Sequence, residues 1–361
     1  MRVLFPFVAD TFGGSHASTL ALAEGLRQRG VTCTFAVQHR GRLALQAESL
    51  GFSVVRLPAK EPVGLGQGLR YRLARARNTY RFGAWLTRQT VDIVHTQDLK
   101  MNLLWGEVCR RQVARHVWHQ RMPLPEIDWK RRILIKGMTV SDQRLFISNY
   151  VINTINTETA FDPVLLKNPI GVPFERMPTR ERTMSENAIV GLIANYLPRK
   201  RFELLLDAAA HGATPYSIRI AGKIPEAVQT ALTQKVRDLG LSDRVTFDGP
   251  VEDPVAWMDG IDVLVCPAVR EAFGRTLIEG MARGCIVVAS ATGGHLEIVR
   301  PDETGLFFPP DDIAALTAQI DRAIAVRATW PRAEIQRKVF EEFGVAAHAA
   351  AVHRQYESLL G

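Results

Sequence analysis

Two glutamates stand eight positions apart in the segment Glu271-Ala-Phe-Gly-Arg-Thr-Leu-Ile-Glu279. A carboxylate can accept hydrogen bonds from two neighbouring hydroxyls, such as those of a sugar ring or a ribose. Gly274 lies between the glutamates, and a glycine lets the backbone approach a ligand closely. The amides that follow it begin an expected helix, whose positive end suits a phosphate. These residue types at this spacing predict a nucleotide-sugar site.

The position of Glu271 in the chain supports this interpretation. The short apolar run 263–266 precedes it and is typical of a buried parallel strand, so Glu271 follows the carboxyl end of that strand. Open α/β sheets bind ligands at that edge. Glu279 has a second interpretation, because Thr276-Leu-Ile-Glu279 also matches a Ser/Thr-x-x-Glu capping box, which needs no ligand.

A group of cations follows another apolar run. The segment Asn195-Tyr-Leu-Pro-Arg-Lys-Arg201 connects an expected strand over 189–194 to an expected helix over 202–210. Cations at such a turn can neutralise the charge that develops on a diphosphate leaving group. The alternative is that these cations are only solvated residues at a helix start.

Apolar runs alternate with helical patterns along the whole chain, which predicts parallel sheets built from βαβ units. The expected strands cover residues 3–8, 32–37, 52–57, 92–95, 116–119, 145–148, 189–194, 217–221, 245–247, 263–266, 286–289 and 306–308. The proline-interrupted polar stretch 162–187 is the expected linker. Two doubly wound α/β domains joined there would leave a cleft between the carboxyl edges of their sheets.

The region 245–311 resembles the donor domain of retaining glycosyltransferases of family 4, whose E-x7-E signature matches Glu271 and Glu279. The segments Gly249-Pro-Val-Glu-Asp253 and Asp302-Glu-Thr-Gly-Leu-Phe-Phe308 also fit that domain. The resemblance implies an α/β chain with the GT-B fold, in which two Rossmann-like, doubly wound parallel-sheet domains face a central cleft.

This fold implies three segments. We expect an acceptor-binding Rossmann-like domain over 1–165 and a nucleotide-sugar-binding Rossmann-like domain over 166–340. We expect residues 341–361 to form a C-terminal helix that packs back on the N-terminal domain.

The resemblance also implies roles for individual residues. By it, Glu271 accepts hydroxyls of the donor sugar and Glu279 accepts those of the nucleotide ribose. The diphosphate would be held by Lys200 and by the backbone amides of Phe273, Gly274, Arg275 and Thr276.

The chain departs from the family at the cation loop. The family pattern there is Gly-Arg-x-x-x-x-Lys-Gly, in which both cations hold the diphosphate. Lys200 matches the lysine, but Asn195 stands in place of the arginine and Arg201 in place of the second glycine. Either a neighbour such as Arg199 supplies the missing charge, or phosphate binding is weaker.

In the first half, Phe12-Gly-Gly-Ser-His16 resembles the glycine loop of the family, so the amides of Gly13 and Gly14 would face the leaving phosphate or the sugar. Many relatives place a histidine of this domain close to the transferred sugar. The candidates are His16, His95 and His119, of which we expect His119 to be catalytic. A structural role is the alternative for each.

No residue is an obvious nucleophile. In such enzymes the departing phosphate is thought to assist the incoming hydroxyl on the same face, so the expected catalytic residues, Glu271, Lys200 and His119, orient groups and stabilise charge. The chain lacks an Asp-x-Asp element. We therefore expect no metal ion and no cofactor.

The charge of the chain is uneven. Residues 1–165 contain 23 Lys and Arg against 12 Asp and Glu, a net charge of +11, whereas residues 166–361 contain 22 against 25, a net charge of −3. A basic first half suits an anionic membrane, an anionic acceptor or a nucleic acid. The chain shows no basic-aromatic module and no zinc-ligand spacing, so we do not expect nucleic acid as a partner.

The segment 69–88 is rich in arginine and is expected to be helical. Leu69, Leu73, Ala76 and Tyr80 share one face of that helix. This face either covers a sheet or rests on anionic lipid.

The lack of targeting features in the sequence predicts one compartment. No run of 18 apolar residues is present, and the N-terminus leads into an expected strand without a signal-cleavage site. The four scattered cysteines indicate neither a disulfide framework nor a zinc site. We expect a cytoplasmic chain that associates peripherally with the inner face of the cytoplasmic membrane.

These observations together predict a retaining hexosyltransferase. It would move a sugar from a nucleotide-sugar donor to a lipid-linked or saccharide acceptor in bacterial envelope polysaccharide or lipopolysaccharide assembly. One alternative is a GT-B nucleotide-sugar epimerase or hydrolase, which would need a carboxylate general base. The other is a catalytically silent GT-B binding protein, which the unusual Asn195 favours.

Overall fold

The computed structural model describes residues 1–8, 13–58, 65–66, 68–155, 161–175 and 187–361. The chain forms two units, of which one contains Met1–Pro169 and Val345–Gly361 and the other Ile170–Gly344. The divisions fall four residues after the expected boundaries at 165 and 340. The second division lies at Gly344, where an extended backbone conformation separates two helices.

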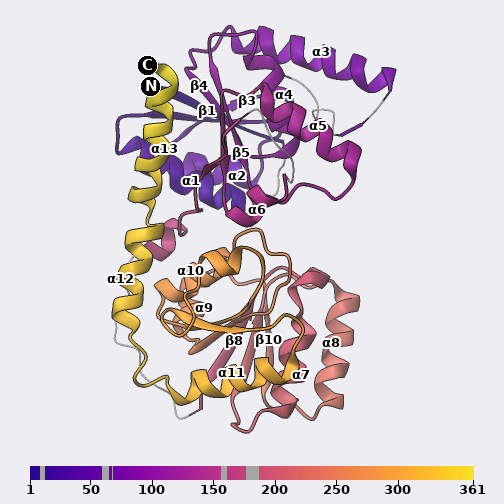
Figure 1. Cartoon of the computed structure of the whole chain (residues 1–361), viewed down its shortest axis with the longest axis vertical. Helices are drawn as coiled ribbons and strands as arrows, with labels where there is room; N and C mark the ends of the chain where they lie inside the picture. Colours follow the sequence, from indigo (N-terminus) through magenta and orange to yellow (C-terminus); the bar gives the residue numbers. More distant parts are fainter. Residues whose placement is uncertain (9–12, 59–64, 67, 156–160, 176–186) are drawn as a thin grey trace. The chain divides into compact units, whose positions relative to one another are not determined.

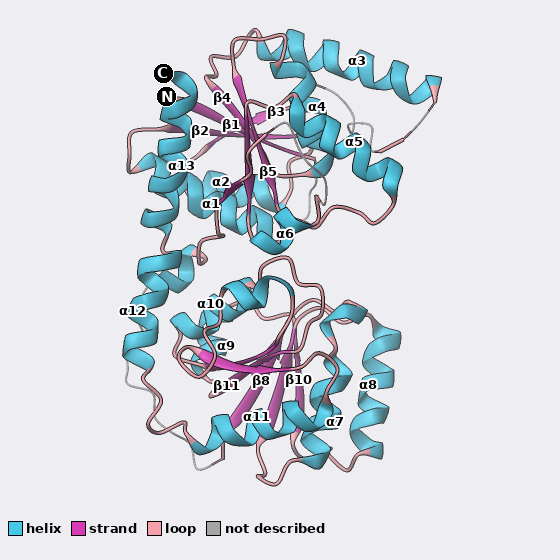
Figure 2. Ribbon diagram, in the orientation of Figure 1, coloured by secondary structure: helices cyan, strands magenta, loops and turns pink. Residues whose placement is uncertain are grey.

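The first unit is built on a parallel sheet with the strand order β3-β2-β1-β4-β5-β6-β7 (Figures 1 and 2). Its strands are β1 (Arg2–Phe7), β2 (Thr32–Val37), β3 (Ser53–Arg56), β4 (Ile93–Thr96), β5 (Arg115–Gln120), β6 (Gln143–Phe146) and β7 (Val164–Leu165). Alternate residues of β1 enter different cores, with Val3 and Phe5 in one and Leu4 in the other. Both faces of the sheet are therefore covered, which explains why its strands are nearly continuous apolar runs.

Helices from distant parts of the sequence cover these two faces. The helices α1 (Gly14–Arg27), α2 (Arg42–Ser49) and α13 (Val345–Leu360) lie on one face, and α3 (Leu69–Leu86) and α4 (Leu99–Cys109) lie on the other. The remaining helices of this unit are α5 (Asp128–Thr139) and α6 (Asn149–Asn153). The helices α1 and α13 pack closely, because a Cβ atom at Gly25 would lie 2.5 Å from the Cβ of Ala349.

The second unit is built on a parallel sheet with the strand order β10-β9-β8-β11-β12-β13 (Figure 2). Its strands are β8 (Ile189–Ile193), β9 (Ser217–Ala221), β10 (Val245–Gly249), β11 (Val263–Cys266), β12 (Ile286–Ser290) and β13 (Gly305–Phe308). Its α-helices are α7 (Phe202–His211), α8 (Glu226–Asp238), α9 (Pro254–Asp259), α10 (Arg275–Ala282), α11 (Ile313–Ala325) and α12 (Arg332–Phe343). Its 3-10 helices are η1 (Val172–Glu175), η2 (Pro198–Lys200) and η3 (Gly293–Glu297).

Residues of β11 again alternate between two packed faces. Val263 and Val265 join the core formed with α7, α8 and α11. Leu264 points to the other face, where a Cβ atom at Gly280 of α10 would lie 2.4 Å from its Cδ2. The prediction of an α/β chain with two doubly wound parallel sheets is confirmed.

In each sheet the strand order reverses between two neighbouring strands, β1 and β4 in the first and β8 and β11 in the second. Open α/β sheets bind ligands outside the carboxyl ends of the strands at such a point. The loops that follow β8 and β11 contain the cation segment and Glu271, so the fold places both at this edge of the second sheet.

All twelve expected strands are present, with ends that differ by no more than two residues. The structure adds β7, a two-residue strand that pairs with β6 inside the expected linker. Its two residues follow a proline and make too short a run for sequence patterning to detect.

Candidate donor site

Glu271 lies in the loop between β11 and α10, where two cations hold its side chain. The Nζ of Lys200 and an Nη of Arg199 lie 2.7 and 2.8 Å from the same carboxylate oxygen, Oε2. Both cations come from η2, which follows β8. The ion pairs therefore join the two loops at the point where the strand order reverses.

The electrostatics keep this carboxylate charged. Only 16% of the Glu271 side chain is exposed. Burial alone would raise the pKa of Glu271, but Lys200 and Arg199 outweigh it and hold the pKa below its ordinary value. Within the described residues, Oε1 of Glu271 accepts no hydrogen bond. The side chain therefore has one oxygen fixed by cations and a second that can accept from a ligand hydroxyl.

Gly274 begins α10 in a conformation that a side chain would disturb. Its φ angle is +110°, and a Cβ atom there would lie 2.8 Å from Cδ2 of His295. The first amides of α10 are not used within the helix and carry the positive end of its dipole. This helix start can therefore receive a phosphate, as the sequence predicted for this turn.

The segment η3 supports the Glu271 loop through backbone contacts. The amide of Gly294 donates to the carbonyl oxygen of Glu271 at 2.8 Å. A Cβ atom at Gly293 would lie 2.5 Å from that oxygen, and one at Gly294 would lie 2.5 Å from the Cα of Phe273. Only glycines permit this close approach, so η3 holds the backbone of the Glu271 loop in place.

Five of the predicted donor residues line one hollow of about 110 Å³ at the carboxyl ends of β8 and β11. They are Lys200, Glu271, Gly274, Arg275 and Thr276. His295 also lines this hollow. Burial lowers the pKa of His295 despite the nearby Glu271, and its Nδ1 donates to the carbonyl of Ser290 at 3.1 Å. Its imidazole is therefore neutral near pH 7.

Three other predicted donor residues have their side chains elsewhere. The Oδ1 of Asn195 accepts from the amide of Lys223, so this side chain braces the loop after β9. Arg201 pairs with Asp311 at 2.9 Å. The ring of Phe273 is buried, with its centroid 6.1 Å from that of Phe343, so only its backbone could meet a ligand.

Arg201 also has a backbone conformation that explains the glycine of the family pattern. Its φ and ψ angles are +53° and +47°, in the left-handed region that glycine adopts most readily. The arginine side chain turns towards Asp311, so the prediction that Arg201 binds the donor phosphates gains no support from its geometry.

The capping-box interpretation of Glu279 is wrong. The N-cap residue of α10 is Gly274, so Thr276 lies inside the first turn of the helix. The Oε1 of Glu279 accepts from Nε of Arg275 at 3.0 Å, and also from an Nη of the same side chain. Glu279 is a buried carboxylate in an i,i+4 ion pair, and its Arg275 partner lines the hollow.

In the first unit, the residues corresponding to the expected glycine loop begin α1. Phe12 lies outside the described residues, whereas Gly13 is the N-cap residue of the helix. The amide of Gly13 donates to Nδ1 of His16 at 3.1 Å, and burial lowers the pKa of His16. Gly14 is the first residue of the helix, so this glycine pair forms a helix N-terminus.

The structure brings His95 and His119 together on the neighbouring strands β4 and β5. Both side chains are fully buried, and Nε2 of His95 lies 3.1 Å from Nδ1 of His119. Nδ1 of His95 contacts the hydroxyl of Tyr356. Tyr356 could not be linked to this site from the sequence, because it is separated from His95 by 261 positions.

The helix α3 has its expected apolar face on the outside of the unit. The side chains of Leu69, Leu73 and Tyr80 are 71%, 61% and 77% exposed, whereas Phe82 and Leu86 are buried. Of the two alternatives for this face, the one in which it covers a sheet is therefore wrong. Different residues of the helix perform that role.

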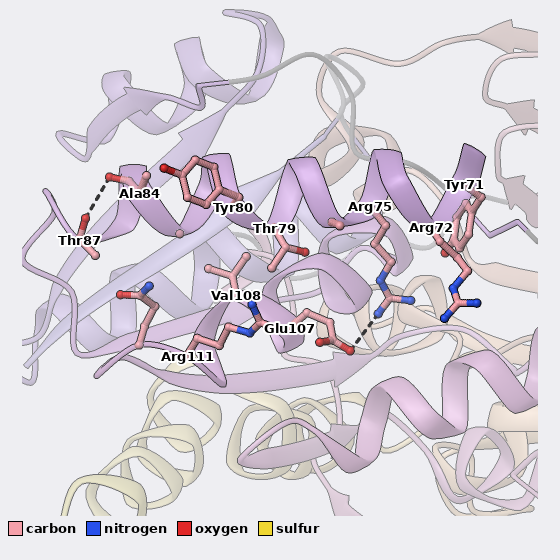
Figure 3. Close-up of a pocket in the computed structure, with 13 residues that line it drawn as sticks. Tyr71, Arg72, Arg75, Thr79, Tyr80, Ala84, Thr87, Glu107, Val108 and Arg111 are labelled. Carbon is pink, nitrogen blue, oxygen red and sulfur yellow. Dashed lines mark hydrogen bonds and ion pairs between the residues drawn. The ribbon is translucent and has the colours of Figure 1, made fainter. Parts of the chain in front are cut away.

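A hollow of about 570 Å³ lies between α3 and α4 (Figure 3). Figure 3 shows Arg75 of α3 pointing towards Glu107 of α4, with which it pairs at 3.3 Å. Arg72 and Arg111 also line this hollow, so the surface beside α3 is basic.

The described residues contain neither a cluster of metal ligands nor a helix suited to cross a bilayer. Within the residues that the structure places, no three His, Cys, Asp or Glu side chains gather as metal ligands. None of the described helices combines the length and the apolar character needed to span a bilayer.

Comparison with known proteins gives a family for both units. Residues 12–170 match the family model described as Glycosyltransferase Family 4, and residues 174–338 match the model described as Glycosyl transferases group 1.

Curated relatives match parts of the chain. The lipopolysaccharide core biosynthesis mannosyltransferase LpsB of Rhizobium meliloti is 33% identical over 37% of this chain and 39% of its own length. The mannosyltransferase LpcC of Rhizobium leguminosarum bv. viciae is 33% identical over 41% of this chain and 44% of its own length. The match thus spans about two fifths of each of these relatives.

Solved structures match nearly the whole chain. A glycosyltransferase from Rickettsia africae has a TM-score of 0.84 at 17% identity and covers 99% of this chain and 98% of its own. Anabaena Alr3699/HepE in complex with UDP-glucose has a TM-score of 0.80 at 18% identity and covers 99% and 100%. At these identities the likeness shows a shared fold.

Proposed function

We propose a reaction for this chain, which belongs to glycosyltransferase family 4 and has the GT-B fold. It transfers a hexosyl group from a nucleotide-sugar donor to a saccharide or lipid-linked acceptor and retains the configuration of the anomeric carbon. The observation that carries this proposal is the hollow where Glu271 and Lys200 meet the N-terminus of α10.

The hollow offers one group for each part of a donor. The second carboxylate oxygen of Glu271 can accept hydroxyls of the sugar. The start of α10 and the side chain of Lys200 can hold the diphosphate. Glu279 lies one turn further along α10 and is the candidate for the ribose hydroxyls.

Arg199 is the candidate for the charge that Asn195 does not supply. Its guanidinium lies 2.8 Å from Glu271, and its side chain is 39% exposed. It can therefore turn from the carboxylate towards an arriving phosphate. In this proposal Arg199 takes the role of the family arginine, and Lys200 keeps the role of the family lysine.

The proposed reaction breaks the bond between the anomeric carbon of the sugar and the phosphate oxygen. An acceptor hydroxyl forms a new bond to the anomeric carbon from the same face, and its proton passes to the departing phosphate oxygen. Negative charge develops on the nucleoside diphosphate during this step. Lys200, Arg199 and the amides of α10 are placed to stabilise that charge, and no cofactor or metal ion is needed in the scheme.

The relatives support the class of donor and acceptor. LpsB and LpcC are named as mannosyltransferases of lipopolysaccharide core biosynthesis. Solved structures of Alr3699/HepE contain UDP and UDP-glucose. For this chain we therefore propose a nucleotide hexose as the donor and a growing envelope glycan as the acceptor.

A panel of nucleotide hexoses incubated with the purified chain tests this reaction. We expect one of them to be hydrolysed slowly to nucleoside diphosphate, and proton NMR should show the released sugar first in the anomeric configuration of the donor. Accumulation of an epimerised nucleotide sugar would identify an epimerase instead. Binding without turnover, with or without an added glycan acceptor, would favour a catalytically silent protein.

The exposed face of α3 supports a second part of the proposal, peripheral attachment to an anionic membrane. At 100° per residue, Leu69, Leu73 and Tyr80 lie within about 40° of one another on the helix. Exposed arginines of α3 flank this stripe at positions 70, 72, 77 and 81. An apolar stripe between cations is typical of a helix that lies in the lipid headgroup layer.

The positive charge of α3 favours binding to an anionic membrane surface. Each arginine near an anionic leaflet contributes about 1 kcal/mol of attraction, and salt screens this contribution. The hollow beside α3, which Arg72 also lines, adds Arg75 and Arg111 to the same basic surface (Figure 3). Such a helix would hold a cytoplasmic enzyme at the inner face of the membrane, close to a lipid-linked acceptor.

Vesicle sedimentation tests this attachment. We expect the chain to bind vesicles that contain phosphatidylglycerol more tightly than phosphatidylcholine vesicles, and to dissociate as the salt concentration rises. Leu73→Asp should weaken binding at least tenfold. Leu45→Asp is the matched control, because Leu45 is 58% exposed but lies on α2. Equal binding to both kinds of vesicle, or equal effects of the two variants, would contradict the proposal.

A further inference from the structure

The hollow between α3 and α4 contains more positive than negative charge (Figure 3). Arg72 and Arg75 line it from α3, and Arg111 lines it from the turn that follows α4. Glu107 is the single acidic residue among the described residues that line it. Its volume of about 570 Å³ falls within the range of small-molecule sites, which is about 300–1,000 Å³. Size and charge together suit an anionic ligand.

The one carboxylate is shared between two arginines. Oε1 of Glu107 lies 3.3 Å from an Nη of Arg75, and its Oε2 lies 3.7 Å from an Nη of Arg110. The side chains of Arg72 and Arg111 have no ion pair and no hydrogen bond with any residue that the structure describes. The positive charge around Glu107 is therefore only partly paired, and a bound anion would pair the remainder.

Small side chains of α3 explain why space is left beside α4. Ala76, Gly83 and Ala84 line the hollow from α3 and lie seven and eight positions apart, which places them on one side of the helix. Val108 lines the hollow from α4. Because none of the three α3 residues has a side chain larger than a methyl group, the two helices leave a gap that larger side chains would fill.

The arrangement of the arginines suits a phosphate group. In Figure 3 the guanidinium groups of Arg72 and Arg75 extend from α3 to the side on which Glu107 and Arg111 lie. A guanidinium can donate two parallel hydrogen bonds to phosphate oxygens, and arginine clusters are a recurring way of binding phosphate. The polar side chain of Gln112 also lines the hollow and can pair with a hydroxyl beside the phosphate.

This hollow is separate from the ligand-binding edge of the first sheet. Asp98 caps α4 directly after β4, so the helix begins at the carboxyl edge of the sheet. Glu107 lies nine residues further along, which corresponds to roughly 13 Å of helix. A ligand held beside Glu107 therefore occupies a second site, away from the edge where open α/β sheets bind their substrates.

The hollow adjoins the exposed apolar stripe of α3. Tyr80 belongs to the stripe and also lines the hollow. At 100° per residue, Ala76 lies about 20° from Leu69 around the helix. An acyl chain in contact with Leu69 and Leu73 would therefore have its headgroup beside the arginines. A soluble phosphate compound would use the arginines but not the stripe, so the combination favours a lipid.

We propose that the hollow between α3 and α4 binds the phosphodiester headgroup of one anionic glycerophospholipid, such as phosphatidylglycerol. Arg72, Arg75 and Arg111 donate to its phosphate oxygens. The unpaired positive charge disfavours a zwitterionic headgroup, because an ammonium group would be repelled. The lipid as the source of the phosphate rests on the proposed membrane attachment. The phosphate site itself does not, because it follows from contacts within the first unit.

Calorimetric titration of the full chain with dihexanoyl-phosphatidylglycerol, kept below the concentration at which it forms micelles, tests the site without a membrane. Arg111→Gln should weaken binding about tenfold or more, because it removes charged hydrogen bonds to the phosphate. Arg29→Gln is the matched control, because it removes the same charge from an exposed arginine that follows α1 and has no ion pair among the described residues. It should change the affinity by less than about twofold.

A second variant separates a phosphate site from a merely apolar contact. Ala76→Leu places a larger side chain in the hollow and also extends the apolar stripe. Leucine is a good helix former, so this exposed change should not disturb α3. It should weaken binding of dihexanoyl-phosphatidylglycerol about tenfold by filling the site. Tighter binding would show that the lipid contacts only the stripe, and would overturn the proposal.

The remaining outcomes distinguish the site, the source of the phosphate and the attachment. No binding of dihexanoyl-phosphatidylglycerol, or equal losses in Arg111→Gln and Arg29→Gln, would overturn the site. Equally tight binding of glycerol phosphate would assign the hollow to a soluble compound, and equally tight binding of dihexanoyl-phosphatidylcholine would overturn the selectivity for an anionic headgroup. If the soluble lipid binds through Arg111 but phosphatidylglycerol vesicles do not bind, the proposed attachment is contradicted and the site stands.

Discussion

Replacing Lys200 with alanine removes a cation from the point where charge develops in the proposed reaction. Its Nζ lies 2.7 Å from Glu271, and 21% of its side chain is exposed. Removing one positioned group that stabilises developing charge costs about 2.7–4 kcal/mol, or a hundredfold to a thousandfold in kcat. The effect on stability should be much smaller, about 1 kcal/mol or less, because Arg199 still pairs with Glu271.

The assay compares Lys200→Ala with Lys235→Ala in steady-state turnover and in thermal unfolding. Lys235 is a matched control, because its Nζ pairs with Asp207 at 2.6 Å and its side chain is 31% exposed, but it lies on α8 away from the hollow. We expect similar small losses of melting temperature and a loss of turnover in Lys200→Ala alone. If Lys200→Ala turns over at the rate of the control, the diphosphate does not bind at this loop.

Four further changes follow from the geometry. Glu279→Gln should weaken binding of the free nucleoside diphosphate by about 1.5–3 kcal/mol, measured by calorimetric titration, because it removes a charged acceptor for the ribose; unchanged affinity would exclude that role. Arg201→Gly should melt at or slightly above the wild-type temperature and remain active, because it relieves a left-handed backbone conformation and loses only the exposed ion pair with Asp311. A large loss of turnover would instead show that Arg201 binds the donor phosphates. The pKa of Glu271 is lowered from 4.5 in the folded chain, so its contribution to the free energy of unfolding is complete above about pH 4.5 and is lost as the pH falls through the folded pKa. Glu271→Gln should remove this part of the pH dependence of the unfolding free energy measured in urea titrations. An unchanged pH profile in the variant would contradict this prediction. Turnover should be the same with and without EDTA, and a loss that Mg²⁺ restores would show that the reaction uses a metal ion.

The strands could be predicted because each is a short apolar run covered on both faces. A run such as 263–266 needs no information from the rest of the chain, and a single loop follows it to Glu271. The hollow at the second sheet was predictable for the same reason. Lys200 and Glu271 each follow a strand beside which the order reverses, so the parallel topology brings them to one edge.

The parts that could not be predicted depend on contacts between distant segments. The side chain of Asn195 braces the amide of Lys223, and Tyr356 reaches His95 across 261 positions. Periodicity identified the apolar face of α3, but it cannot say whether a sheet or solvent lies against that face. The capping box failed because Gly274 starts the helix two residues before Thr276.

Calorimetric titration of Glu271→Gln with two ligands tests the central claim most directly. One ligand is the nucleotide sugar that the chain hydrolyses, and the other is the nucleoside diphosphate without the sugar. If Glu271 accepts hydroxyls of the sugar, the variant should bind the nucleotide sugar about 10- to 150-fold more weakly, the cost of a hydrogen bond to a charged group. It should bind the nucleoside diphosphate as tightly as the wild type or more tightly, because Lys200 and Arg199 are released from their pairing with the carboxylate. Equal losses for both ligands, or no loss for either, would contradict the assignment of this hollow to the donor sugar.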